Sequence, residues 1–357
     1  MIAVVSVTFV LPGLARRANG GYRMAYHHAN YLASHGHSVR ILHMRANWLK
    51  PAPLRKKVLI SARYLLGRRR GPSWFPLSDQ VVVRNYAEMR AGPVPPSDAV
   101  VATSVATAAL VNQVTSHQKN GVYLIQGLED FTVPREQVFE TWHLPLERVV
   151  VSGWLQDLAR QRGLASTLIE NGVDTSVFTT GDPTTVRSPS VLAMVSEHPY
   201  KRTDLVIELM RRLANEYPHV TLTTFGTCQR PDGLPPSTNH WRDPSLSQLV
   251  SLYQQTQVYV CTSDFEGFGL PALEAMACGC AVVSTENGGV PAFAGRAAVY
   301  VERGSAPRLF QRVIQLLTSS TNRLHLVEKA ATRVPELSLS KSCRRFEEVI
   351  LRVASQK

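Results

Sequence analysis

The chain has 357 residues, of which 44% are hydrophobic, and its 39 Lys and Arg against 27 Asp and Glu give a formal net charge of +12. This length permits two domains of ordinary size, and the lack of any apolar run of about 18 residues excludes a membrane-spanning helix. Five scattered cysteines favour a reducing compartment and no disulfide framework. Residues 1–13 have no charged segment before their apolar run, which favours a buried strand over a signal peptide.

In the first half of the chain, apolar runs alternate with segments of helical periodicity. The apolar runs predict strands at 2–10, 38–43, 81–83, 99–102, 122–125 and 148–152. The helical segments are 22–35, 104–116, 135–141 and 154–162. Asn19-Gly20-Gly21 follows the first strand, where backbone without side chains either approaches a phosphate closely or forms a tight turn into the helix.

The second half shows the same alternation. Strands are expected at 190–195, 220–226, 258–261, 281–284 and 298–301. Helices are expected at 204–216, 245–255, 270–277, 307–317, 323–331 and 340–354. The segment 172–189 between the halves is polar and rich in Gly, Pro, Ser and Thr, which is typical of a domain boundary.

Strands that alternate with helices at this spacing predict an α/β protein with parallel, doubly wound sheets, one in each half. We therefore expect two Rossmann-like domains that face each other across a cleft. The first would comprise residues 1–175 and the second residues 176–338, with a C-terminal helix in 339–357.

The segment 258–295 carries the strongest signal for chemistry. A strand ends in a glycine-rich loop, and a helix follows with Pro271 in its first turn and Gly279 just past its end. The backbone N–H groups of such a loop and the positive end of the helix dipole favour phosphate. Glu266 and Glu274 flank this loop, where carboxylates would accept hydroxyl groups on either side of a diphosphate, as in a nucleotide sugar. Taken singly, either glutamate is better explained as an ordinary charge of a loop or a helix start, and only the whole pattern favours the functional role.

This segment strongly resembles the retaining glycosyltransferases of family 4, which have the GT-B fold. The resemblance rests on the E-x7-E pattern Glu266-Gly-Phe-Gly-Leu-Pro-Ala-Leu-Glu274, on 275–279 and 287–291, on 169–174 with Phe178, and on Lys201 with Asp204. These motifs cover most of the second half, and the first half matches more loosely. The last helix of GT-B enzymes commonly crosses back to the first domain, which the resemblance implies for 339–357.

The resemblance also implies roles for individual residues. The catalytic set would be Glu266, Lys201 and Gln126. The donor would be bound by Gly20, Gly21, Arg202, Gly267, Phe268, Gly269, Leu270 and Glu274. The nucleotide base would lie near Gly226, Trp241 and Arg242, and Glu129 would face the acceptor or be an ordinary loop charge.

Two positions depart from the family pattern. Ser196 stands where many members have an arginine, so Arg202 is expected to supply part of the missing charge. Gln126 stands where many members have a histidine near the sugar, and its amide would bond to a hexose hydroxyl or to the acceptor.

The expected activity is retaining, metal-independent transfer of a hexosyl or deoxyhexosyl unit from a nucleoside-diphosphate sugar to a hydroxyl of a glycan or lipid-linked acceptor in bacterial cell-surface glycan synthesis. No Asp-x-Asp metal motif is present, and no cofactor or metal is expected. Three alternatives stay open: a natural-product glycosyltransferase with a small-molecule acceptor, a GT-B sugar-nucleotide epimerase, and a degenerate binding protein.

Most of the positive charge excess lies in residues 1–175, and 50–70 is its densest part. As a helix this segment would be basic and amphipathic, which suits either an anionic membrane surface or packing on the domain with the cations in water. Nucleic acid is not an expected partner, because no binding module accompanies the basic segment. The expected location is the cytoplasm, with a peripheral place at the inner face of the plasma membrane as an option.

Overall fold

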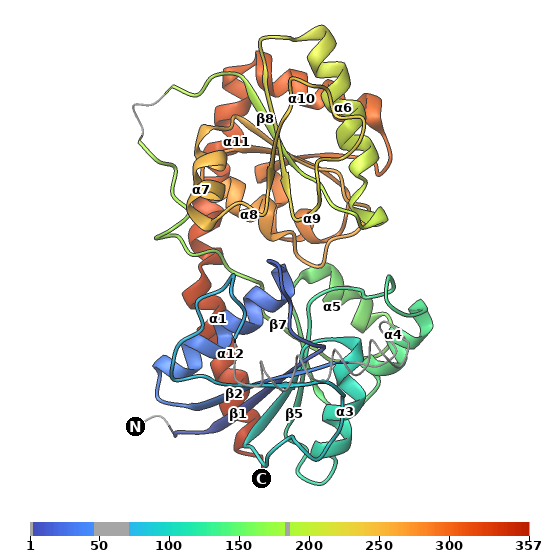
Figure 1. The fold of residues 1–357 in the computed structure, drawn as a ribbon, viewed down its shortest axis with the longest axis vertical. Coiled ribbons are helices and arrows are strands. Elements are labelled where there is room, and N and C mark those ends of the chain that lie inside the picture. Colours follow the sequence, from blue (N-terminus) through green and yellow to red (C-terminus); the bar gives the residue numbers. More distant parts are fainter. Residues whose placement is uncertain (1–2, 46–70, 183–185, 357) are drawn as a thin grey trace. The chain divides into compact units, whose positions relative to one another are not determined.

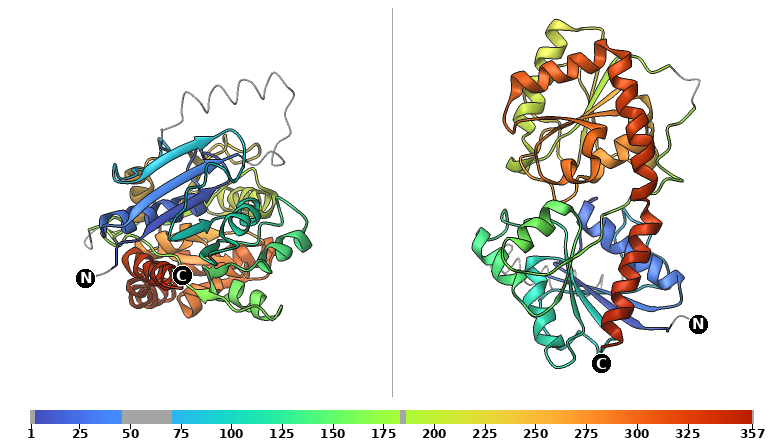
Figure 2. Two further views of the ribbon diagram at one scale, coloured as in Figure 1. Left: turned by 90° about the horizontal axis from the view of Figure 1, so that it is seen from below. Right: turned by 180° about the vertical axis from the view of Figure 1, so that it is seen from behind.

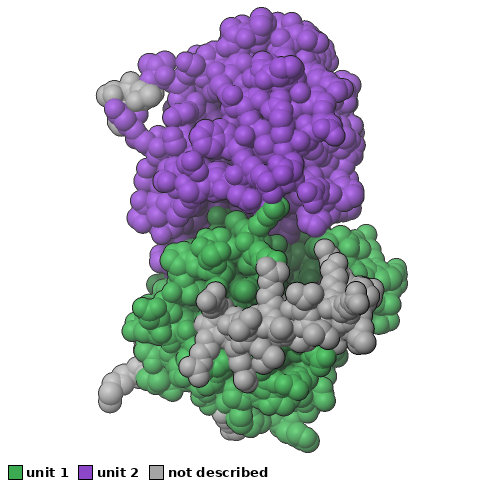
Figure 3. Space-filling view, viewed as in Figure 1, with its two compact units in different colours: residues 1–170, 342–357 green, residues 171–341 purple. Residues whose placement is uncertain are grey.

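The computed structural model describes residues 3–45, 71–182 and 186–356. The chain divides into two compact units (Figure 3): unit 1 comprises residues 1–170 and 342–357, and unit 2 comprises residues 171–341. The division thus falls a few residues before the boundary expected from composition. The basic segment 50–70 lies outside the described residues.

Unit 1 is built on a parallel sheet of seven strands in the order β3-β2-β1-β4-β5-β6-β7 (Figure 1). Its strands are β1 (Ser6–Leu11), β2 (Ser38–Met44), β3 (Val82–Tyr86), β4 (Ala99–Ala102), β5 (Gly121–Ile125), β6 (Glu147–Val150) and β7 (Thr167–Leu168). Its helices are α1 (Gly20–Ser34), α3 (Val105–Thr115), α4 (Arg135–Trp142), α5 (Gly153–Arg160) and α12 (Leu339–Ala354), the last of which begins in unit 2.

The C-terminal helix α12 packs on unit 1 (Figure 2). Its Phe346 ring stacks on Phe9 of β1 and on His28 of α1, at centroid distances of 6.0 and 4.4 Å. The buried His37 ring lies 3.1 Å from the Glu347 carboxylate and accepts a hydrogen bond from the backbone N–H of Val5. Apolar burial and this polar contact therefore join the last helix to the first two elements of the chain.

Unit 2 has a parallel sheet of six strands in the order β10-β9-β8-β11-β12-β13. Its strands are β8 (Ser190–Met194), β9 (Thr221–Gly226), β10 (Asn239–Arg242), β11 (Val258–Cys261), β12 (Ala281–Thr285) and β13 (Ala298–Val301). Its helices are α6 (Thr203–Glu216), α7 (Leu246–Gln255), α8 (Leu270–Ala277), α9 (Gly289–Ala294), α10 (Ala306–Thr318) and α11 (Ser320–Arg333), with short 3-10 turns η1 (Pro199–Lys201), η2 (Gly295–Ala297) and η3 (Val334–Leu337).

The central strands of the unit 2 sheet are covered on both faces, which explains why β8, β11 and β12 are largely apolar runs. α6 and α10 pack their apolar stripes on one face, where Val191, Val260 and Val283 are fully buried. On the other face Tyr253 of α7 contacts Tyr259 of β11, and α8 packs on β11 and β12. Because both sheets reverse their order beside the first strand, each unit has a switch point between two strand ends where α/β proteins bind ligands.

The structure confirms the expected class of two parallel α/β units, and β4, β11, β13 and α8 have the predicted bounds. It adds β7, β10 and α9, which the sequence did not predict. β7 and β10 are short and only partly buried, and α9 begins directly after the glycines of 287–291. β1 is shorter than predicted, because pairing with β2 begins at Ser6. All five cysteines are free and buried, as expected.

Candidate active site

The centre of the candidate site is an ion pair between Lys201 and Glu266, which are 65 positions apart in the sequence. Lys201 lies in the loop after β8 and Glu266 in the loop after β11, so both stand at the switch point of unit 2. Lys201 Nζ donates to Glu266 Oε1 at 2.7 Å, and the two side chains are only 15% and 10% exposed. Burial opposes the charge of Lys201, but the carboxylate beside it holds the pKa of the ammonium above its usual value.

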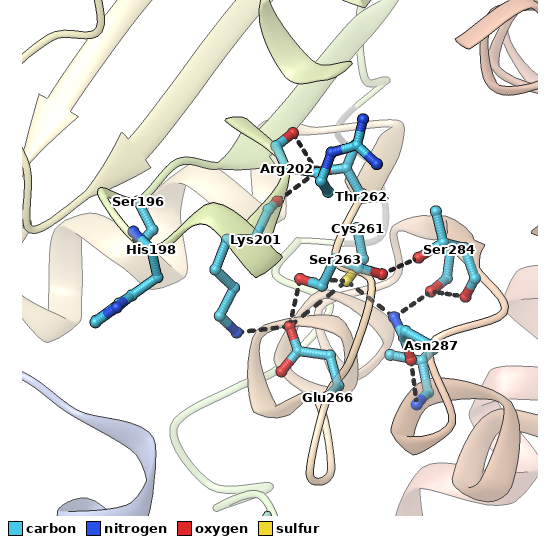
Figure 4. A network of polar contacts seen from close by, with 12 residues as sticks. Ser196, His198, Lys201, Arg202, Cys261, Thr262, Ser263, Glu266, Ser284 and Asn287 are labelled. Atoms are coloured by element: carbon cyan, nitrogen blue, oxygen red, sulfur yellow. Dashed lines mark hydrogen bonds and ion pairs between the residues drawn. The ribbon is translucent and has the colours of Figure 1, made fainter. Parts of the chain in front are cut away.

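The contacts of Glu266 converge on one of its two carboxylate oxygens (Figure 4). Ser263 Oγ donates to Oε1 at 2.7 Å, beside the bond from Lys201, and the Cys261 thiol lies 3.9 Å away. Within the described part of the chain, Oε2 has no hydrogen-bond partner, so this oxygen remains an acceptor for a hydroxyl group. Burial and the nearby Glu266 raise the pKa of the Cys261 thiol to about 11, which keeps the thiol neutral at ordinary pH.

The loop of Glu266 is held from behind by Asn287. The Asn287 amide donates to Ser284 Oγ at 3.0 Å and to Cys261 Sγ at 3.4 Å, and its side-chain oxygen accepts from the N–H of Val290 at 3.0 Å. Its backbone carbonyl accepts from the N–H of Glu266 at 3.0 Å. Sequence reasoning assigned no role to Ser263 or to Asn287, although Ser263 lies three positions before Glu266 and Asn287 is the first residue of the 287–291 motif.

The loop of Lys201 is tied to the same region by hydroxyl groups. Thr262 Oγ1 donates to the carbonyls of Lys201 and Arg202 at 2.9 and 3.2 Å. Thr203 Oγ1 accepts from the N–H of Ser196 at 3.0 Å and donates to its carbonyl at 2.8 Å. Ser196 Oγ in turn accepts from the N–H of His198 at 3.2 Å, so Ser196 shapes the loop after β8.

The N-terminus of α8 lies directly after Glu266. In the described ranges no side chain caps this helix, and no hydrogen bond engages the N–H groups of Phe268, Gly269 or Leu270. Gly269 has φ +100, a conformation that favours glycine. Phe268 anchors the turn by stacking on Phe293 with a centroid distance of 4.6 Å. Gly267 lies between these residues and Glu266. The arrangement offers the donors of a helix start to an anion.

Gly289 shows how closely the two loops approach. A Cβ atom at this position would lie 2.6 Å from the Phe268 carbonyl oxygen and 2.7 Å from that of Glu266. The backbone of the loop after β12 therefore supports the backbone of the Glu266 loop, and any side chain would force them apart. This contact explains the glycine of the 287–291 motif in physical terms.

Glu274 is buried inside α8 and is 2% exposed. Its Oε2 accepts a hydrogen bond from the Tyr253 hydroxyl at 3.1 Å. The structure thus places Glu274 on the side of α8 that faces α7, while Glu266 lies at the start of the same helix.

Arg202 is held by two carboxylates. Its Nε and Nη2 donate to Asp204 at 3.0 and 2.7 Å, and its Nη1 donates to Asp264 at 3.3 Å. The side-chain hydrogen bond to Asp204 is the main cause that raises the pKa of the guanidinium. Acidic side chains therefore bind this guanidinium in the structure. From the sequence we had expected it to face the donor.

The three residues expected near the nucleotide base lie on neighbouring strands. Gly226 ends β9, and a Cβ there would lie 2.2 Å from the carbonyl oxygen of Val195, so only glycine fits. Trp241 and Arg242 belong to the edge strand β10, beside β9, and both are exposed. Trp241 is 39% exposed and offers an aromatic surface at this edge.

In unit 1 the structure brings Gln126 to the glycine signal. Gln126 Nε2 donates to the carbonyl of Gly21 at 2.9 Å across 105 positions, and the buried Gln126 Oε1 has no partner among the described residues. Gly20 opens α1, and Asn19 Oδ1 accepts from the N–H of Gly21 at 3.0 Å. The side chain of Asn19 thus occupies a donor that the sequence had offered to a phosphate.

Glu129 lies on the same loop as Gln126 and binds the start of α3. Its Oε1 accepts from the backbone N–H of Val105 at 3.1 Å, and the Ser104 side chain adds a second hydrogen bond. Burial raises the pKa of this carboxyl to about 7, although these two hydrogen bonds oppose the rise. Glu129 thus joins the loop after β5 to the helix after β4.

No helix in the described ranges is long and apolar enough to cross a membrane. Among the same residues, no group of three or more His, Cys, Asp or Glu side chains is arranged to hold a metal ion.

The segment that holds the Lys201–Glu266 pair matches a protein family. Residues 189–319, which include Lys201, Glu266 and Glu274, match the model of the family described as glycosyl transferases group 1. The D-inositol 3-phosphate glycosyltransferase of Segniliparus rotundus is 28% identical over 185 residues, which are 46% of this chain and 41% of that protein. The enzyme of the same name from Corynebacterium urealyticum is 33% identical over 105 residues, 29% of this chain and 24% of that one. The chain thus spans less than half of the length of these relatives.

Solved structures resemble the whole chain at low identity. Sucrose-phosphate synthase from Thermosynechococcus elongatus has a TM-score of 0.76 and 15% identity, with 99% of this chain and 100% of that one covered. The Anabaena protein HepE, solved in complex with UDP-glucose, has a TM-score of 0.72 and 15% identity, with 97% and 99% covered. These likenesses show the fold. Residues 189–319 thus match the glycosyl transferases group 1 model, in a chain whose two units have the fold of the GT-B glycosyltransferases.

Proposed function

We propose that the protein is a retaining glycosyltransferase that moves a hexosyl or deoxyhexosyl unit from a nucleoside-diphosphate sugar to a hydroxyl of a glycan or lipid-linked acceptor. One observation carries this proposal. The buried Lys201–Glu266 pair stands at the switch point beside the uncapped start of α8, inside the segment that matches the glycosyl transferases group 1 model.

The charges of the site suit a diphosphate leaving group. Negative charge develops on the phosphate as the bond to the sugar breaks, and fixed positive partners lower the barrier. Lys201 supplies a cation that its raised pKa keeps protonated at neutral pH, and the start of α8 supplies N–H groups. Glu266 Oε2 would accept a sugar hydroxyl, because Oε1 is already engaged by Lys201 and Ser263.

In the proposed reaction the bond between the anomeric carbon and the phosphate oxygen breaks. The acceptor oxygen bonds to the same carbon on the same face, so the configuration is retained. The acceptor proton passes to an oxygen of the departing phosphate, and the products are the glycoside and the nucleoside diphosphate. No side chain serves as a nucleophile in this scheme, and no metal is needed to balance it.

The relatives suggest which substrates to test first. A uridine diphosphate sugar leads the donor panel, because HepE was solved with UDP-glucose and with UDP. D-inositol 3-phosphate joins the bacterial glycans and lipid-linked sugars in the acceptor panel, because curated relatives are named for it. On the acceptor side we keep Glu129 and Gln126 as candidates. We also propose a place at the cytoplasmic face of the membrane, for which anionic vesicles would test the segment 50–70.

The test is a thermal-shift screen in the presence of EDTA against UDP, GDP, dTDP, ADP and their sugar conjugates. A nucleotide that binds the folded state raises the melting temperature by mass action. We expect one base to respond, and Lys201→Met and Glu266→Gln to weaken the response strongly while leaving a measurable affinity. Glu216→Gln is the matched control, because it removes an exposed ion pair with Arg212 on the outer part of α6. A protein that responds to no nucleotide at millimolar concentration would contradict the proposal.

Turnover then separates the alternatives. With the responding donor and the acceptor panel, NMR of the product should show the anomeric configuration of the donor. An inverted product would refute retention, and loss of activity in EDTA would refute metal independence. Interconversion of the sugar nucleotide without an acceptor would indicate an epimerase. Transfer to small aglycones alone would indicate natural-product glycosylation, and binding without any turnover would indicate a degenerate binding protein.

A further inference from the structure

We infer that Arg202 is a positioning residue, which clamps the loop of Lys201 to the loop of Glu266 through Asp264 and does not itself bind the donor phosphate. The inference rests on the proposed function, since the clamp would act through the Lys201–Glu266 pair. It reassigns a cation that the sequence placed among the donor-binding residues.

The contacts of Arg202 join the loop of Lys201 to the loop of Glu266. Arg202 directly follows Lys201, and Asp264 lies two positions before Glu266, so the contact between Arg202 and Asp264 joins the two loops beside the ion pair. Two further contacts run in parallel with it: the N–H of Asp264 donates to the Tyr200 carbonyl at 2.7 Å, and the hydroxyl of Thr262 donates to the Arg202 carbonyl. The guanidinium is therefore part of a seam between the loops, of which Figure 4 shows the bonds from Thr262 to the carbonyls of Lys201 and Arg202.

The charge of the Arg202 guanidinium is balanced by two carboxylates. Asp204 receives two parallel bonds from the guanidinium, and Asp264 receives a third. Hydrogen bonding to Arg202 lowers the pKa of Asp204, so this carboxylate is ionised at neutral pH. Among these three side chains one guanidinium faces two carboxylates, so Arg202 offers no net positive charge to a phosphate. Arg303 donates to the backbone carbonyl of Asp264 at 3.4 Å and belongs to the same neighbourhood. Lys201, by contrast, faces one carboxylate in a neutral pair beside the helix start.

The backbone of Arg202 is strained. Arg202 has φ +52 and ψ +50, a left-handed conformation that is costly for a residue with a side chain. Such a conformation persists only where surrounding contacts hold it in place. Here the forked bond to Asp204, which lies on the first turn of α6, and the bond to Asp264 help to hold it. They act beside the hydrogen bond from the Arg202 N–H to the Pro199 carbonyl and the bond from Thr262 to the Arg202 carbonyl. The strained residue thus sets the direction in which Lys201 enters the site.

The decisive variant is Asp264→Asn, because the two models predict opposite signs for the responding nucleoside diphosphate. If Arg202 bound phosphate, removal of a nearby carboxylate would free the guanidinium and tighten binding. If Arg202 clamps the loops, the same change loosens Lys201 and weakens binding, by roughly five- to tenfold. Arg202→Asn should weaken binding to the same extent, since asparagine tolerates the left-handed conformation but cannot bridge the loops. The control Glu216→Gln should leave the affinity unchanged.

A double-mutant cycle shows through which residue Arg202 acts. In a Lys201→Met background, Arg202→Asn should have little further effect, because the residue that it positions is gone. Additive losses, or tighter binding by Asp264→Asn, would overturn the inference while the proposed function stands. Arg202→Lys should recover part of the affinity, because it restores a charge for Asp264 without the fork.

A measurement without ligand keeps the clamp testable if no nucleotide binds, in which case the proposed function fails first. Hydrogen–deuterium exchange of residues 196–203 and 262–270 should rise in Arg202→Asn and in Asp264→Asn, and should stay at the wild-type level in Glu216→Gln. Unchanged exchange in both loops for the first two variants would overturn the clamp.

Discussion

The ion pair of Lys201 and Glu266 gives a stability prediction that needs no substrate. Lys201→Met keeps the apolar stem of the side chain and removes the charge that neutralises a carboxylate only 10% exposed. Breaking a buried pair by removing one partner costs about 3–5 kcal/mol, because a buried charge is left unpaired. Ser263 still donates to Glu266 at 2.7 Å and partly offsets the lost partner, so we expect a loss just below that range, about 2–3 kcal/mol.

The double variant Lys201→Met/Glu266→Gln should recover most of this loss, because it removes the second charge as well. For a unit of this size, 1 kcal/mol corresponds to about 2–4 °C in melting temperature, so the single variant should melt roughly 4–12 °C below the wild type.

Calorimetry of the four proteins of the cycle, without nucleotide, measures the coupling energy directly. We expect about 1.5–3 kcal/mol, in the range observed for residues in one buried network. A single variant as stable as the wild type, or a double variant no more stable than the single one, would mean that the pair does not form in the free protein. The charge argument for the site would then fail.

Three further predictions concern other buried groups. The pKa of Glu129 is raised to about 7, so the folded state is favoured while this carboxyl is protonated. The free energy of unfolding of unit 1 should therefore fall by about 1–2 kcal/mol between pH 5 and 8 relative to Glu129→Gln, and parallel pH profiles of the two proteins would refute this. Burial lowers the pKa of His28 to about 3, so the neutral ring is the folded form; His28→Leu should gain stability relative to the wild type as the pH drops from about 7 to 5, and a constant difference in urea unfolding would count against it. Gly289→Ala places a Cβ 2.6 Å from the Phe268 carbonyl oxygen, so it should destabilise unit 2 and weaken nucleotide binding. The control Gly153→Ala meets no atom within 4 Å and should be neutral or stabilising. Equal effects of the two variants in thermal unfolding would contradict the contact.

Much of the fold could be predicted from the sequence, because its signals are local. The apolar run at Val258–Cys261 and the proline and glycine that bound Leu270–Ala277 each mark an element by propensity within a few residues, and both elements have the expected bounds. β10 and α9 were not predicted. β10 is an edge strand whose residues are mostly exposed, so it has no apolar pattern, and α9 begins at a glycine that a local reading assigns to a loop.

The site divides in the same way. The sequence by itself determined that Glu266 and the start of α8 form a glycine-rich helix entry, because this depends on a few consecutive residues. Only the tertiary structure decided that Lys201 reaches Glu266 across 65 positions, since the strand order places their two loops side by side. It also decided that Arg202 pairs with Asp264 as well as with Asp204. Asp264 lies in another loop, and the spacing along the chain does not show which loops meet.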